Sequence, residues 1–249
     1  MFLNTVIFQI SVVIFTATLF RSAFGFGESL IGVPLLALWI PLNIAVPLSV
    51  LVSITIAAFV VVQDRKKIHI QSAGRLILYS IIGIPLGLLL LINTNDHLVK
   101  AILGAVIIIF SIYLLSGKQL QQLDKDSQAW LFGCGLISGI LGGAYGLNGP
   151  PLVIYGTKRR WSAQHFRATL QGYFLVASFV GMIGYWISGL LSAAVFHYYL
   201  ITLPSLIPAI FLGRVINHRL HGDYFFKYVY VILLGIGIFL TINALKGSL

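Results

Sequence analysis

The chain contains very little charge, and this scarcity excludes an ordinary soluble protein. Charged residues make up 9% of its 249 residues and hydrophobic residues 59%, whereas soluble domains carry about 25% charge. Long stretches contain no Asp, Glu, Lys or Arg, among them 29–63, 101–117 and 168–213. A membrane-spanning helix needs about 20 mostly apolar residues. The sequence therefore predicts an all-α integral membrane protein, a polytopic bundle with several spans.

Cysteine is almost absent, and the signatures of catalysis are absent altogether. The one cysteine, Cys134, excludes an internal disulfide and a cysteine metal cluster. There is no His-Glu-x-x-His, no Walker loop and no Gly-x-Ser-x-Gly. We therefore expect no enzyme, no metal and no cofactor. Lys and Arg (16) outnumber Asp and Glu (6), but they lie mostly in short loops beside apolar segments. This placement indicates a lipid bilayer as partner rather than nucleic acid.

The chain divides into two halves that contain similar interruptions of apolar sequence. Residues 25–35 read GFGESLIGVPL and residues 142–152 read GGAYGLNGPPL. A shift of 117 positions aligns Gly25, Gly32, Pro34 and Leu35 with Gly142, Gly149, Pro151 and Leu152. We expect a first repeat at 1–116, a polar connecting loop at 117–128 and a second repeat at 129–249. Together they would form one transmembrane domain.

Each half is expected to contain five helical segments. They are 3–23, 30–41, 44–62, 76–92 and 99–116, then 129–141, 150–157, 168–187, 193–212 and 227–245. The last segment of each half opens with an acid four residues before a lysine, Asp96 with Lys100 and Asp223 with Lys227. This spacing favours an ion pair within one helix.

Loop charges predict how the halves lie in the membrane. The basic loops are 64–75, 157–167 and 213–226, and the connections without Lys or Arg are 41–44, 93–98 and 188–192. Basic loops face the cytoplasm by the positive-inside rule. Where one half has a basic loop, the equivalent loop of the other half has no Lys or Arg. We therefore expect inverted repeats in the cell membrane, with both termini outside.

The interrupted segments are too short for two full crossings. Residues 127–157 are 31 uncharged residues that include a turn of about ten, whereas two crossings need about 40. We therefore expect short-helix hairpins whose turns meet near the membrane midplane. Paired broken segments of this kind point to a transporter substrate site. Proline favours the first position of a helix, so Pro34, and Pro150 or Pro151, are expected to begin the short helices.

Exposed helix N-termini at such turns would bind a small anion, because their backbone N–H groups are unpaired and positively polarised. Arg21 either binds an anionic substrate through two parallel N–H groups or extends toward water from the membrane interface. Glu28 is the only glutamate; it is a proton carrier, a partner of Arg21 or a cap for its own turn. The candidate substrate-binding residues are Arg21, Gly25, Gly27, Gly32, Pro34, Gly142, Gly143, Tyr145, Asn148, Gly149, Pro150, Pro151 and Gln171, with Glu28 as the candidate for proton coupling.

These motifs resemble the sulfite exporter TauE/SafE family of membrane permeases. The second turn is the closer match (GGAYGLNGPPLVIY, 142–155), supported by Phe166-Arg167-Ala168-Thr169 and by the polar loop in mid-chain. The first turn departs from the family's frequent glycine run, because Glu28 and Ser29 occupy part of it. The resemblance implies transport of small sulfur-containing anions, such as sulfite or organosulfonates, without ATP hydrolysis.

We therefore expect a secondary transporter of small anions that works by alternating access. An anion channel that uses the same helix termini is the alternative, and an intramembrane enzyme would need a catalytic group that the sequence lacks. The direction of transport and the oligomeric state stay open at this point.

Overall fold

The computed structural model describes residues 2–65, 68–117, 122–219 and 223–246, and this part of the chain contains helices and no strands. The helices are α1 (Phe2–Phe24), α2 (Glu28–Leu36), α3 (Leu42–Asp64), α4 (Ile70–Asn93), α5 (Asp96–Leu115), α6 (Gln128–Tyr145), α7 (Gly149–Lys158), α8 (Ala163–Ile187), α9 (Ala193–Arg219) and α10 (Asp223–Lys246). The all-helical prediction is confirmed, and each half contains five helices.

The two turns are shorter than expected, and several glycines and prolines lie inside helices instead. Only three residues separate α1 from α2 and α6 from α7. Gly142, Gly143 and Tyr145 belong to α6, and Pro34 lies within α2 rather than at its start. Small residues do not end a helix in apolar surroundings, because a broken backbone hydrogen bond finds no replacement there. The chain turns where glycine adopts a positive φ, at Gly25, Gly27 and Gly146.

The helix boundaries also correct the register between the halves. A shift of 121 positions carries Glu28, the first residue of α2, to Gly149, the first residue of α7. The same shift carries Leu42 at the start of α3 to Ala163 at the start of α8. The shift of 117 was therefore wrong by about one helical turn.

Six helices in the described part of the chain are long and apolar enough to cross a membrane, namely α1, α3, α4, α5, α8 and α9. Helices α2 and α7 contain 9 and 10 residues. At 1.5 Å per residue they are about 15 Å long, half of a hydrocarbon core of about 30 Å. Helix α6 was expected to be short as well, but its 18 residues extend about 27 Å. Only one arm of each hairpin is therefore short.

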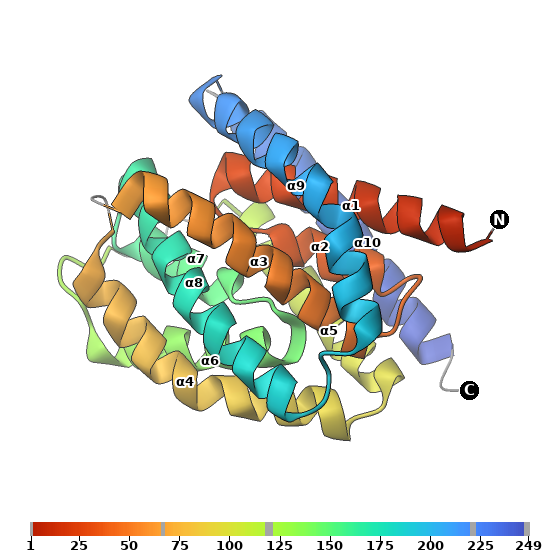
Figure 1. Ribbon diagram of the computed structural model, residues 1–249. Coiled ribbons are helices and arrows are strands. Elements are labelled where there is room, and N and C mark those ends of the chain that lie inside the picture. Colours follow the sequence, from red (N-terminus) through yellow and green to blue (C-terminus); the bar gives the residue numbers. More distant parts are fainter. Residues whose placement is uncertain (1, 66–67, 118–121, 220–222, 247–249) are drawn as a thin grey trace.

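The two halves interlock rather than form separate units (Figure 1). Helix α1 packs against α9, α4 against α6, α3 against α8, and α5 against α10. Each of these pairs joins one helix from the first half to one from the second. The largest group of buried apolar side chains likewise draws on both halves, from Phe26 to Leu240.

Glycines allow the closest of these helix pairs to form. On α4, a Cβ at Gly83 or Gly87 would meet the backbone of α6, and a Cβ at Gly139 or Gly143 would meet the backbone of α4. Close backbone approach through small residues is the usual basis of helix association in membranes, where no hydrophobic force drives helices together.

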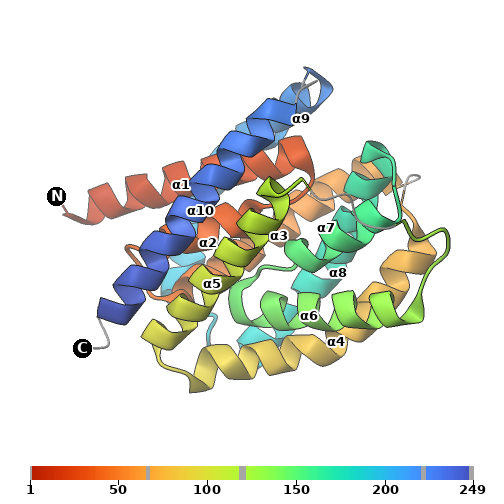
Figure 2. The ribbon, with the colours of Figure 1, turned by 180° about the vertical axis from the view of Figure 1, so that it is seen from behind.

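The loops gather at two ends of the molecule according to their charge. At one end, Asp126 accepts a hydrogen bond from Ser72 (2.9 Å) and pairs with Arg159 (3.0 Å), which joins the connecting loop to the first turn of α4 and to the end of α7. At the other end, the backbone N–H of Leu42 donates to Asp96 (3.4 Å). These two residues and Leu190 line one cavity. The beginning of α1 and the end of α10 lie toward this second end (Figures 1 and 2).

The contacts of Asp126 keep its side chain charged. Burial alone would raise the pKa of this carboxyl group, but hydrogen bonds from Tyr155 and Ser72 and the charge of Arg159 lower its pKa below the ordinary value.

The predicted ion pair of Asp96 and Lys100 is confirmed at 2.7 Å. The side chains of Asp223 and Lys227 lie outside the described part of the structure.

Replacing Gly139 with Val should destabilise the protein, because its side chain would collide with the backbone of α4 at Ser80. Overpacking of this kind costs about 1–3 kcal/mol, measured as a lower melting temperature in detergent. Gly133→Val on the same helix is the matched control, because no atom lies within 4 Å of a Cβ there. Equal melting temperatures for the two variants would contradict the proposed α4–α6 contact.

Candidate functional site

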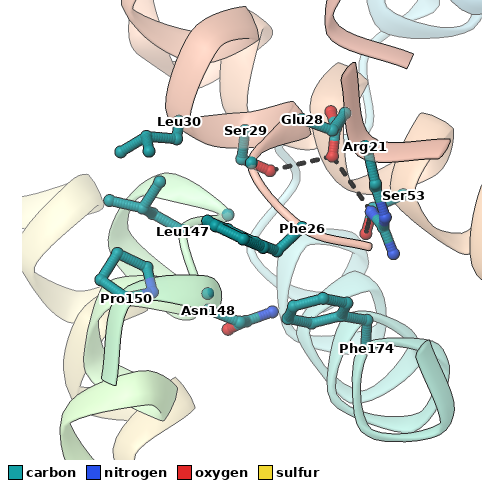
Figure 3. A pocket seen from close by; sticks show the side chains of 13 residues that line it. Arg21, Phe26, Glu28, Ser29, Leu30, Ser53, Leu147, Asn148, Pro150 and Phe174 are labelled. Carbon is teal, nitrogen blue, oxygen red and sulfur yellow. Dashed lines mark hydrogen bonds and ion pairs between the residues drawn. The ribbon is translucent and has the colours of Figure 1, made fainter. Parts of the chain in front are cut away.

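A small cavity lies between the two turns (Figure 3). The first turn contributes Phe26 and Gly27, the second contributes Gly146, Leu147 and Asn148, and the first residues of α2 and α7 complete these walls. Its volume is about 20 Å³, which accommodates about one water molecule. The two turns therefore meet as expected, and the site between them is closed in this conformation.

Arg21 and Glu28 form a buried ion pair at this cavity. Nη1 of Arg21 lies 3.2 Å from Oε2 of Glu28, and the side chains are 3% and 1% exposed. The same Nη1 donates a hydrogen bond to Ser53 on α3 (2.6 Å). Both charged residues also line the cavity. Glu28 is thus the ion-pair partner of Arg21, and both side chains border the cavity in which a ligand would bind.

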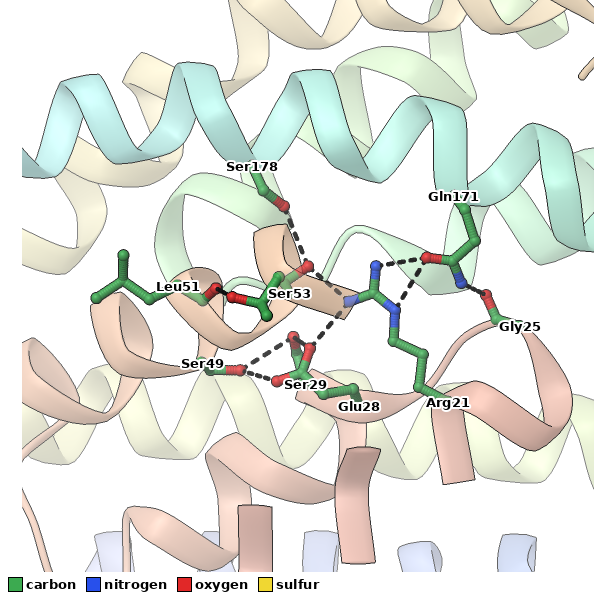
Figure 4. A network of polar contacts seen from close by, with 10 residues as sticks. Arg21, Gly25, Glu28, Ser29, Ser49, Leu51, Ser53, Gln171 and Ser178 are labelled. Atoms are coloured by element: carbon green, nitrogen blue, oxygen red, sulfur yellow. Dashed lines mark hydrogen bonds and ion pairs between the residues drawn. The ribbon is translucent and has the colours of Figure 1, made fainter. Parts of the chain in front are cut away.

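The second half of the chain holds the other side of the guanidinium group (Figure 4). Oε1 of Gln171 on α8 accepts hydrogen bonds from Nη2 (2.8 Å) and Nε (3.3 Å) of Arg21. Nε2 of Gln171 donates to the carbonyl oxygen of Gly25 in the first turn (2.7 Å). The ring of Phe174, one turn further along α8, lies 4.8 Å from Cζ of Arg21. Gln171 therefore fixes Arg21 and the first turn together.

Serines hold the carboxylate of Glu28 in place. Ser49 donates to Oε1 (2.6 Å) and Ser29 donates to Oε2 (3.0 Å). The sequence contains a signal that could have identified Ser49 and Ser53, because they lie four residues apart in a mostly apolar helix and so share one face. Ser178 on α8, which lies 3.2 Å from Ser53, was also missed.

The two short helices differ in what their N-termini offer an anion. Helix α2 begins after Gly27 without a side-chain cap, so the N–H groups of its first residues have no partner within the helix. Helix α7 does begin beside Pro150 and Pro151, as expected. Proline has no N–H group, so these two residues remove donors from that end. The N-terminus of α2 therefore offers more backbone N–H donors than the N-terminus of α7.

Asn148 contributes a buried polar atom to the cavity wall. The side chain is 5% exposed, and its Oδ1 has no hydrogen-bond partner within the described structure. Its backbone carbonyl accepts a hydrogen bond from Ser138 (2.6 Å). Gly142 lies directly beneath it, because a Cβ at that position would overlap Oδ1 of Asn148. Gly142 thus supports the site from inside α6.

Other predicted residues lie outside the cavity. Gly32 faces Ala17 of α1, Gly143 packs on α4, and Tyr145 is fully buried with no hydrogen-bond partner for its hydroxyl in the described part. Pro34 lies within α2, and Pro151 borders a separate groove. The structure brings together Arg21, Gly25, Gly27, Glu28, Asn148, Gly149, Pro150 and Gln171.

The site therefore combines one cation, one carboxylate and several neutral hydrogen-bonding groups. The described residues contain no cluster of three or more His, Cys, Asp or Glu side chains that could hold a metal. With Arg21 paired to Glu28, the site has no net charge. The guanidinium group of Arg21 donates to Glu28, Ser53 and Gln171, so its described hydrogen-bond partners all belong to this network.

Replacing Glu28 with Gln should destabilise the protein, because it leaves the buried charge of Arg21 without a counter-charge. Removal of one partner of a buried ion pair costs about 3–5 kcal/mol, measured by denaturation in detergent without added anions. The double variant Arg21→Met/Glu28→Gln is the control and should recover much of this loss. If the double variant loses stability relative to the native protein by the sum of the losses measured for Arg21→Met and Glu28→Gln separately, the two side chains are not coupled.

Residues 10–240 match the family model described as sulfite exporter TauE/SafE. The match covers nearly the whole chain, including both turns and every residue of the polar network around Arg21. Neither a curated protein nor a solved structure gives a significant match.

Proposed function

Because the chain belongs to the sulfite exporter TauE/SafE family, a family of membrane transporters, we propose that it carries small sulfur-containing anions across the membrane by alternating access. The family and the six apolar helices make it a multi-pass membrane protein. One observation carries the proposal for the site. A buried guanidinium group, Arg21, lies beside a cavity enclosed by two glycine turns.

Arg21 suits an oxyanion with several equivalent oxygens. A guanidinium group presents parallel N–H donors that match two oxygens of one anion, and sulfite and sulfonates have this arrangement. The N-terminus of α2 adds backbone donors on the same side. We therefore assign Arg21 and the first residues of α2 to the charged part of the substrate, and Asn148 to a neutral contact opposite.

Glu28 competes with the substrate for Arg21, and this competition provides proton coupling. While the carboxylate is charged it holds the guanidinium group at 3.2 Å. A proton on Glu28 would remove that charge and leave Arg21 to bind an anion. By linkage, a proton that strengthens anion binding is itself bound more strongly when the anion is present. Proton and anion would therefore occupy the site together.

The position of the network between the two halves supports the proposal of alternating access. Arg21 and Gly25 belong to the first half and Gln171 to the second, so movement of one half against the other would break their hydrogen bonds. The closed cavity of about 20 Å³ means that a substrate enters only after such a movement. This also disfavours the alternative of a permanently open anion channel.

The pairing of helices supports two inverted repeats. The order of helices makes α1 equivalent to α6 and α4 equivalent to α9. Helix α1 packs on α9 while α6 packs on α4, so each contact has an equivalent in which the halves exchange roles. Together with the opposite loop charges, this supports the inverted arrangement that places both termini outside the cell membrane.

Anions should stabilise the purified protein more strongly at lower pH. Sulfite, thiosulfate, sulfoacetate, taurine, sulfate, acetate and chloride would each be added at two pH values, and the melting temperature measured. One linked proton strengthens binding up to about tenfold per pH unit. In Glu28→Gln this pH dependence should vanish while binding remains. The exposed Asp124→Asn is the matched control and should behave as the native protein.

Two outcomes would count against this assignment. Stabilisation by carboxylates alone would refute the sulfur-anion class while leaving the site intact. An unchanged pH dependence in Glu28→Gln would remove Glu28 from coupling, whichever anion binds.

Cysteine labelling of intact cells tests the orientation. In a Cys134→Ser background, Asn43→Cys lies in the first turn of α3, at the end where the loops without Lys or Arg gather. Lys125→Cys lies in the polar loop at the opposite end, and both positions are exposed. A membrane-impermeant thiol reagent should label Asn43→Cys and spare Lys125→Cys until the cells are opened. The reverse pattern would place both termini in the cytoplasm.

A further inference from the structure

A large apolar groove is lined by residues of α5, α6 and α7. Helix α5 packs on α10 and α6 packs on α4, so these two helices stand apart (Figure 2). The groove has a volume of about 650 Å³, within the range of small-molecule sites. Its walls include Ile109 on α5 and Ile137 on α6, which are 68% and 52% exposed. The groove therefore faces the lipid laterally.

A buried cation lies at one end of this groove. Nζ of Lys158, at the end of α7, lies 4.3 Å from the ring centroid of Trp130, which lines the groove. Lys158 is only 6% exposed, and no carboxylate of the described residues lies within ion-pair distance of it. Ile154, one helical turn earlier on α7, also lines the groove. The side chain is packed against Trp130, and its ammonium group has no carboxylate beside it among the described residues, so this end of the groove suits an anion.

We propose that the groove holds one acyl chain of an anionic glycerophospholipid, whose phosphate group pairs with Lys158. The apolar walls match the acyl chain, and the ammonium group of Lys158, which has no carboxylate partner among the described residues, matches the phosphate. Tryptophan is enriched at the level of lipid headgroups, which agrees with Trp130 beside Lys158. Basic pockets between helices on the cytoplasmic side bind anionic headgroups, and Lys158 lies at the end where the basic loops gather.

The groove extends to the wall of the candidate site. Pro150 lines both the groove and the cavity beside Arg21, and Pro151 lines the groove alone. A bound acyl chain would therefore press on the first turn of α7 from the side opposite the cavity. Any effect of the lipid on transport rests on the function proposed above, whereas lipid binding itself does not.

Two variants distinguish binding of the lipid's acyl chain from binding of its headgroup. Gly133→Leu would fill the groove, because Gly133 lines it and no atom lies within 4 Å of a Cβ there. Lys158→Gln removes the charge and leaves the groove open. The matched control is Gly235→Leu on α10, an exposed glycine whose Cβ would also meet no atom within 4 Å.

Native mass spectrometry would measure the lipid retained by the purified protein. Dioleoyl phosphatidylglycerol and dioleoyl phosphatidylcholine, which differ only in the headgroup, would be supplied in equal amounts. The native protein and Gly235→Leu should retain the anionic lipid about fivefold better, the factor for one basic residue near an anionic surface. Lys158→Gln should lose this preference, and Gly133→Leu should lose both lipids.

Three results would overturn the proposal. These are equal retention of both lipids by the native protein, lipid retention by Gly133→Leu equal to that of Gly235→Leu, or a dimer that Gly133→Leu dissociates. The last result would mean that a second copy of the chain occupies the groove. None of these results depends on whether the protein transports sulfur anions.

Discussion

The buried pair of Arg21 and Glu28 is the constraint around which the rest of the site is arranged. Two charges within an apolar bundle are costly unless each donor and acceptor is satisfied. Here α3 supplies Ser49 and Ser53, and α8 supplies Gln171, so both charged groups have several partners. These partners determine how α1 and α2 must lie against α3 and α8, and the same requirement places the two turns opposite each other.

This arrangement joins stability to the proposed transport cycle. Gln171 holds both Arg21 and the carbonyl of Gly25, so the halves cannot separate at this point without breaking bonds inside the site. In the proposed cycle, a substrate anion would replace Gln171 and Glu28 as partners of Arg21, and a proton would neutralise Glu28. In this proposal, movement of the halves is coupled to binding, because the halves move apart only when a ligand replaces the internal bonds of the site.

The close helix contacts allow this arrangement to exist in a membrane. Lipid tails are as apolar as leucine side chains, so the helices gain little by hiding apolar surface from one another. The glycines of α4 and α6 instead bring the two backbones together, and Gly142 admits the side chain of Asn148 beneath the second turn. Where helices stand apart, as between α5 and α6, a groove remains that lipid can fill.

The sequence by itself determined the membrane class, the five helices of each half and the grouping of loops by charge, because these depend on local composition and on charge near helix ends. It also identified Arg21, Glu28, Asn148 and Gln171 as candidates. Only the tertiary structure decided that Gln171 meets Arg21 across 150 positions, that Ser49 and Ser53 complete the network, and that the turns contain three residues each. Glycine and proline leave open where a membrane helix ends, since this depends on packing and on the φ angles that neighbouring helices permit.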